Sequence, residues 1–139
     1  MKRSLLAAVL IFTSWTLVDT FAHRFVLQRL YAASPTIWRP SDELNPWLIT
    51  GVSMALVAVF VVVYGWFIRP KSLVAGLRFG VVLGVGFGVA SGFGSYIHSP
   101  IPLSLAWAWT VLGTGKGVIA GVLLGALIAK GEGSVVPAA

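Results

Sequence analysis

Two residues of opposite charge lie inside long apolar stretches of this chain, Asp19 in the first and Lys116 in the last. A charge at the centre of a bilayer costs about 2.5 to 3.5 kcal/mol, so each side chain is expected to face protein and to find a partner. Counted inward from one membrane surface, Asp19 lies about 21 Å and Lys116 about 20 Å along its helix. The sequence therefore predicts a buried ion pair. The alternative is that Lys116 extends to water while Asp19 accepts a hydrogen bond from Ser or Thr.

The two histidines of the chain are expected near the same membrane surface. His23 follows Asp19 by four residues, which places both on one helix face, and His98 lies at the end of the third apolar stretch. Three interpretations stay open: a path for protons or ions through His23, Asp19 and Lys116; a bis-histidine haem or metal site made by His23 and His98; or interfacial histidines without chemistry. We expect no resident cofactor or metal.

The string "GTGKG" around Lys116 invites comparison with a phosphate-binding loop. That loop requires GxxxxGK followed by Ser or Thr, between a strand and a helix. Here threonine replaces the first glycine, Gly117 follows the lysine, and the flanks are apolar. The apolar stretches also hold no nucleophile beside a base, no carboxylate pair and no His-Glu metal motif. We therefore expect a protein that is not an enzyme.

These residues require elements that place them in a membrane. Of 139 residues, 58% are hydrophobic and 10% are charged, whereas soluble domains are about 25% charged. Four apolar stretches are long enough to span a bilayer as helices, at about 5–32, 47–68, 73–97 and 103–129. They lack the alternation of a membrane barrel. We predict one all-α domain over residues 1–139, a four-helix transmembrane bundle in the lipid bilayer, with no nucleic-acid partner.

Glycines recur at every fourth position of the third and fourth stretches: Gly76, Gly80, Gly84, Gly88 and Gly92, then Gly113, Gly117, Gly121 and Gly125. Such a stripe leaves one helix face without side chains, and small residues let helices approach closely in lipid. We predict glycine-zipper packing between these two helices, with homo-oligomerisation through any stripe left uncovered. The glycines at positions 113, 115 and 117 are also expected to admit the helix that carries Asp19.

The basic residues are unequal on the two sides of the predicted membrane. One side has Lys2, Arg3, Arg69, Lys71, Arg78 and Lys130, and the other has Arg24, Arg29 and Arg39. Because basic residues are enriched on the cytoplasmic side, both termini are expected in the cytoplasm. The net charge of +6 fits contact with anionic lipid head groups. We expect a bacterial inner-membrane location.

Three segments, "LYAASPTIWRPSDELNPWL", "GLRFGVVLGVGFG" and "SPIPLSLAWAW", resemble those of a group of small four-span bacterial membrane proteins, an uncharacterised family. The resemblance covers nearly the whole chain and implies the same topology. It carries over no catalytic residue. An acidic residue in the fourth span is expected in such proteins, and Lys116 departs from that pattern.

Together these features favour a small non-enzymatic membrane protein, a scaffold or accessory subunit whose glycine-rich helices contact a second copy or a larger membrane complex. A small transporter or channel, with a polar path through Asp19, Lys116 and His23, is the alternative. A haem or metal protein using His23 and His98 is the third interpretation.

Overall fold

A computed structural model describes residues 2–128 of the chain, and within them every regular element is helical. Four helical segments are long and apolar enough to cross a membrane: Lys2–Val26, Pro46–Phe67, Leu73–His98 and Leu103–Ile128. The prediction of an all-α protein with four candidate spans is confirmed. The predicted end of the fourth span, residue 129, and Lys130 lie outside the described residues.

The first apolar stretch is not one uniform helix as predicted. Helix α1 (Lys2–Phe21) continues into a π-helical turn, η1 (Ala22–Val26), bends at Leu27 and resumes as the short α2 (Gln28–Ala32). The amide of Leu27 donates to the carbonyl of Ala22 at 2.8 Å, which closes the wide turn. The bend lets Leu27, only 4% exposed, pack against Ile101 and Leu105. Burial of this side chain is thus the physical reason that a single helix over 5–32 is interrupted.

Side-chain caps mark the start of the second and third spans. Two short 3-10 turns, η2 (Pro35–Ile37) and η3 (Ser41–Glu43), lead to α3 (Pro46–Phe67), which Asn45 caps by accepting from the amides of Trp47 and Leu48. Helix α4 (Leu73–His98) begins with Ser72 as its cap, and α5 (Leu103–Ile128) follows. These side-chain caps satisfy amides that have no partner within the helix.

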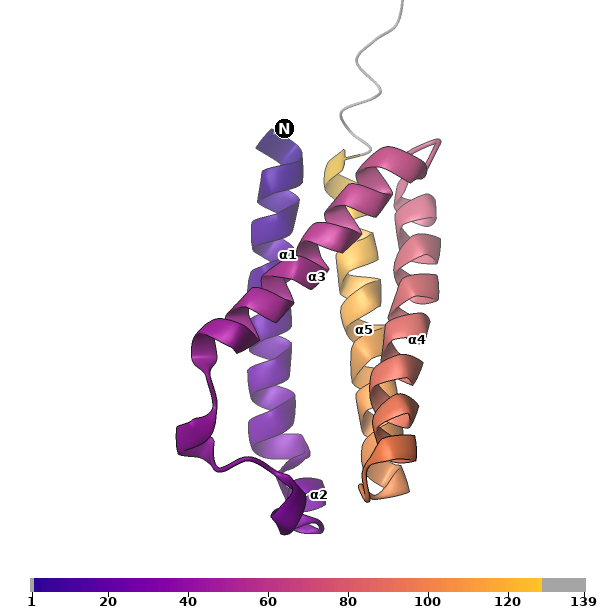
Figure 1. The fold of residues 1–139 in the computed structure, drawn as a ribbon. Coiled ribbons are helices and arrows are strands. Elements are labelled where there is room, and N and C mark those ends of the chain that lie inside the picture. Colours follow the sequence, from indigo (N-terminus) through magenta and orange to yellow (C-terminus); the bar gives the residue numbers. More distant parts are fainter. Residues whose placement is uncertain (1, 129–139) are drawn as a thin grey trace, which may run out of the picture.

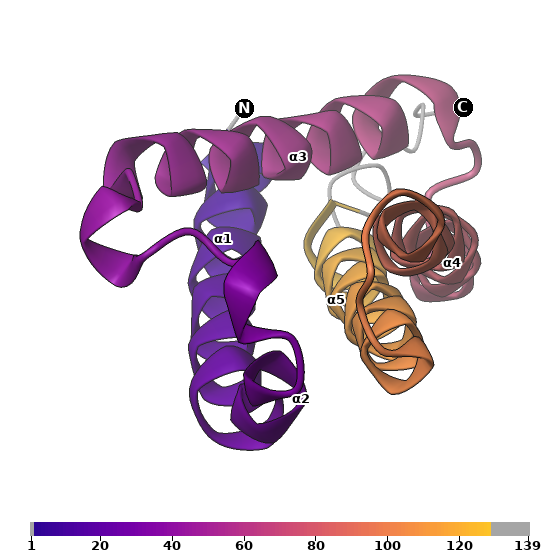
Figure 2. The same cartoon turned by 60° about the horizontal axis from the view of Figure 1, so that its bottom comes forward.

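The long helices form two units, α1 and the α4–α5 hairpin, and α3 crosses both. Helices α4 and α5 are an antiparallel hairpin, α1 stands next to α5, and α3 runs diagonally across them (Figures 1 and 2). The N-terminus and the α3–α4 connection lie at one end of the bundle, and α2 lies at the other (Figure 1). The largest core cluster lies where α3 crosses, and Trp15 meets Phe60 there edge-on at 5.3 Å between ring centroids.

Helices α4 and α5 approach backbone to backbone. A Cβ atom added to Gly80 would lie 2.8 Å from the Cα atom of Gly121, closer than two such atoms can come. All nine glycines at the predicted stripe positions meet the opposite helix or its flank in this way, whereas a Cβ on Gly86 or Gly115 would meet nothing within 4 Å. Within the interface, the hydroxyl of Thr110 lies 2.9 Å from the carbonyl of Ala106 on its own helix and 3.2 Å from that of Gly88 on α4, so its one proton is shared between the two oxygens.

The glycines near Lys116 do not admit α1, and that expectation is wrong. Gly113 and Gly117 face Gly88 and Gly84 of α4, and Gly115 is open. The reason is geometric. Residues at every fourth position share one helix face, so Gly113 and Gly117 both face α4, while the adjacent Lys116 faces α1. Helix α1 therefore meets α5 through side chains.

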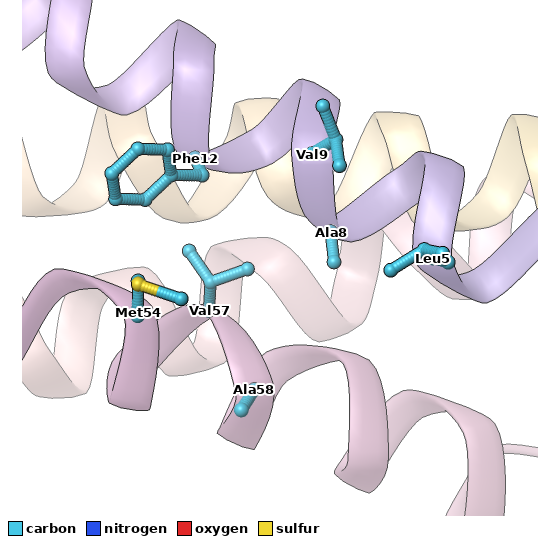
Figure 3. A pocket seen from close by; sticks show the side chains of 7 residues that line it. All are labelled: Leu5, Ala8, Val9, Phe12, Met54, Val57 and Ala58. Carbon is cyan, nitrogen blue, oxygen red and sulfur yellow. The ribbon is translucent and has the colours of Figure 1, made fainter. Parts of the chain in front are cut away.

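An apolar groove separates the first half of α1 from the middle of α3. Its volume is about 310 Å³. The side chains that line it come from both helices: Leu5, Ala8, Val9, Phe12, Met54, Val57 and Ala58 (Figure 3). The groove holds no charged side chain, so it suits hydrocarbon and offers no chemistry.

Candidate functional site

The polar residues of the first span lie one helical turn apart. Trp15 and Asp19 belong to α1, and His23 follows in η1, each separated from the next by four residues. This spacing places the three side chains near one side of the helix. Trp15 is 2% exposed, which shows that this side of α1 is covered by the bundle.

Lys116 reaches from α5 to this side of α1. Its Nζ atom lies 2.6 Å from Oδ2 of Asp19, so the structure brings together the two charges that the sequence places at equal depth. The Lys116 side chain is 18% exposed and that of Asp19 is 30% exposed. The pair is therefore partly shielded, and its attraction is stronger than that of a pair fully in water.

Trp15 holds the same lysine in two further ways. Its indole N–H donates to the backbone carbonyl of Lys116 at 2.8 Å, and its ring lies 5.0 Å from the lysine ammonium. A cation at this distance from an indole face is attracted by the ring. Lys116 is thus bound to α1 at its backbone and at its charged end, which fixes the position of α5 relative to α1.

A cavity of about 210 Å³ is lined in part by Lys116. Its walls come from α1, α3, α4 and α5: Trp15, Leu56, Phe60, Phe87, Ser91, Gly113, Lys116 and Gly117. A water molecule takes about 30 Å³, so this volume is large enough for several. The hydroxyl of Ser91 already donates to the carbonyl of Gly88 at 3.1 Å, which leaves its oxygen able to accept.

His23 is hydrogen-bonded to Tyr31 rather than to Asp19. The indole N–H of Trp109 donates to the Tyr31 hydroxyl oxygen at 3.0 Å, and the same hydroxyl contacts Nδ1 of His23. Because an indole can only donate, the tyrosine proton is available for His23. This direction assigns Nδ1 as the acceptor and leaves the proton of a neutral His23 on Nε2. Tyr31 lies beyond the candidate span Lys2–Val26, and its burial raises its pKa above the ordinary 10.0.

His23, Tyr31 and Trp109 also line an outer pocket of about 460 Å³. We define the outer pocket by its six lining residues: His23, Tyr31, Trp38, Arg39, Leu44 and Trp109. The indole of Trp38 donates to the backbone carbonyl of Tyr31 at 3.0 Å and packs edge-on against its ring. One of these residues, Tyr31, belongs to α2, which lies at the end of the bundle away from the N-terminus (Figure 1).

The predicted residues therefore separate into two places. Asp19 and Lys116 are in contact, and His23 lies one turn further along, in the wall of the outer pocket. His98 is exposed at the end of α4 and does not line that pocket. Among residues 2–128, no group of three or more His, Asp or Glu side chains is placed to hold a metal ion.

Sequence reasoning missed the partners that hold these groups. Trp15 precedes Asp19 by four residues, a spacing that could have indicated it as a second contact for Lys116. Tyr31 and Trp109 carry no such spacing signal, because Tyr31 is eight residues from His23 across the bend at Leu27 and Trp109 lies on a different helix. No protein-family model, curated protein or solved structure matches the chain.

Proposed function

We propose that this chain is a non-enzymatic integral membrane protein, a small scaffold or accessory subunit that packs through glycine-rich helices. The observation that carries the proposal is the contact of Lys116 with Asp19 and Trp15. These contacts join α1 to the α4–α5 hairpin and pair Asp19 of α1 with Lys116 of α5. A frame held in this way presents its other helix faces in a constant arrangement.

The exposed apolar side chains on the first half of α3 form the surface best suited to a partner. Its side chains are largely uncovered, with Trp47 84%, Leu48 65% and Val52 61% exposed. An apolar face of this kind suits lipid or another membrane helix. The glycine stripes of α4 and α5 are already used within the chain, so this proposal assigns the partner contact to α3.

The proposed location is the bacterial inner membrane, with both termini in the cytoplasm. Lys2 and Arg3 lie at the same end of the bundle as the α3–α4 connection with Arg69 and Lys71, which supports this orientation (Figure 1). The chain has no cysteine, so single-cysteine variants report it cleanly. We expect Thr36→Cys to react with an impermeant maleimide in intact cells and Ser4→Cys to react only after lysis. The reverse pattern would invert the topology.

Purification from native membranes tests the scaffold role. We expect a colourless protein that co-purifies with one membrane partner in fixed ratio. Val52→Trp should remove that partner, because a large side chain would obstruct the exposed face of α3. Val82→Trp is the matched control, since Val82 is a similarly exposed valine on α4 (70%). A haem spectrum, or equal partner loss in both variants, would contradict the proposal.

The second candidate function is a small transporter or channel with a polar path through Asp19, Lys116 and His23. The cavity lined by Lys116 is the observation that favours it, because it places about 210 Å³ of space next to one member of the ion pair. Proton or cation flux into liposomes measures this directly. Flux by the native chain that is lost in both Asp19→Asn and Lys116→Gln would replace the scaffold role by transport. Equal flux with and without protein would remove the transport alternative.

A further inference from the structure

The outer pocket has polar groups that no other part of the described chain uses. Within residues 2–128, Arg39 has no ion pair or hydrogen bond, and its guanidinium carries five N–H donors. His23 accepts at Nδ1 from Tyr31, which leaves Nε2 as a donor. Asp42 and Glu43 follow in the same loop, and neither is paired with Arg39. Arg39, an exposed residue, thus brings a full positive charge to a pocket whose walls are otherwise almost entirely apolar.

The remaining walls are apolar and aromatic. Trp38, Tyr31 and Trp109 form a cluster with ring centroids 5.1 to 6.3 Å apart. Tryptophan and tyrosine side chains of this kind lie at the boundary between lipid tails and head groups. The pocket volume of about 460 Å³ is within the usual range of small-ligand sites, about 300 to 1,000 Å³. Donors next to an apolar wall fit a molecule that has an anionic group on an apolar body.

We propose that the outer pocket binds an anionic phospholipid, with the lipid phosphate at Arg39 and His23 and its upper hydrocarbon against Trp38 and Trp109. Arginine binds phosphate through its planar pair of donors. The location at the membrane boundary favours a lipid over a soluble phosphate, because the surrounding bilayer supplies the apolar body. A cationic ligand, which an aromatic cluster alone would attract, is opposed by Arg39.

Native mass spectrometry of the full chain in detergent tests the proposal. The probes are dioleoyl phosphatidylglycerol and dioleoyl phosphatidylcholine, whose acyl chains are the same and whose head-group charges differ. We expect the anionic lipid to bind more tightly and Arg39→Gln to weaken its binding about fivefold, the effect of one basic residue near an anionic lipid. Arg29→Gln is the matched control, an exposed arginine at the same end of the bundle that does not line the pocket.

Three results would overturn the proposal. Equal binding of the two lipids would show that charge is not recognised, and equal loss in Arg39→Gln and Arg29→Gln would show that the pocket is not the site. Glycerol phosphate that binds as tightly as the lipid, with the same dependence on Arg39, would assign the pocket to soluble phosphates. Because Arg39 is exposed, Arg39→Gln is expected to keep the native helix content, and circular dichroism verifies this. Arg39→Lys keeps the charge and should retain part of the binding.

Discussion

Helix α5 is held by two different kinds of contact on adjacent residues. Gly117 and its stripe press against the backbone of α4, whereas Lys116 bonds to Asp19 and Trp15 of α1. The α4 side consists of many short-range contacts between small residues, none of them strong alone. The α1 side adds a few directional bonds to the packing of apolar side chains.

This difference shows two solutions to one problem. In lipid, apolar burial between helices gains little over contact with lipid tails, so association needs close packing or polar bonds. Close packing fixes how near two helices come, and it tolerates no added side chain. A polar contact fixes depth and rotation at one point, and it tolerates looser packing, as the cavity beside Lys116 shows. The two interfaces should therefore respond to different substitutions.

The largest effect is expected on the α4 side. Gly80→Leu should separate α4 from α5 and lower the free energy of unfolding by about 3 kcal/mol or more, because overpacking a close interface forces the backbones apart. Gly86→Leu is the control on the same helix, since a Cβ there meets nothing within 4 Å. Unfolding in mixed detergent micelles measures both. Similar losses in the two variants would mean that the glycine stripe is not the contact.

The next effect is expected on removal of the cation. Lys116→Ala should lower the free energy of unfolding by about 2 kcal/mol, less than the 3 to 5 kcal/mol typical of fully buried pairs because both side chains are partly exposed. Arg78→Ala, an exposed basic residue of α4, should change stability little. The same unfolding assay compares them, and a stable Lys116→Ala protein would show that Asp19 needs no partner.

A smaller loss of stability is expected when the indole N–H of Trp15 is removed. Trp15→Phe keeps an aromatic ring in the core but loses the bond to the Lys116 carbonyl, so we expect a loss of about 1 kcal/mol. Trp66→Phe is the control, because Trp66 is 74% exposed. If the two variants unfold alike, the indole bond contributes nothing measurable to the joining of α1 and α5.

The smallest effect concerns Tyr31 and depends on pH. Burial raises the pKa of Tyr31 above 10.0, so the folded state binds the phenol proton more tightly than the unfolded state. The stabilising contribution of that proton is complete below pH 10 and is lost as pH rises through the raised value. Tyr31→Phe should remove this alkaline loss, as measured by unfolding between neutral and alkaline pH. An unchanged pH profile would mean that Tyr31 does not cause it.

Much of this arrangement follows from sequence, and the exceptions have a physical cause. Four apolar stretches predict four spans, and helical rise alone places Asp19 and Lys116 at one depth. The contacts between helices depend on how each helix is rotated about its own axis. The glycines near Lys116 face α4, and Leu27 ends the first helix by packing against Ile101 and Leu105. Such choices depend on which neighbours are present, and one sequence does not specify them.

A double-mutant cycle between Asp19 and Lys116 tests the central claim that this pair joins α1 to the hairpin. Asp19→Asn, Lys116→Gln and the double variant are compared with the native chain by unfolding in the same micelles. The account predicts that the double variant loses less stability than the two single variants added together, by about 1 kcal/mol or more. Strictly additive losses would show that the two charges do not stabilise each other, and would contradict it.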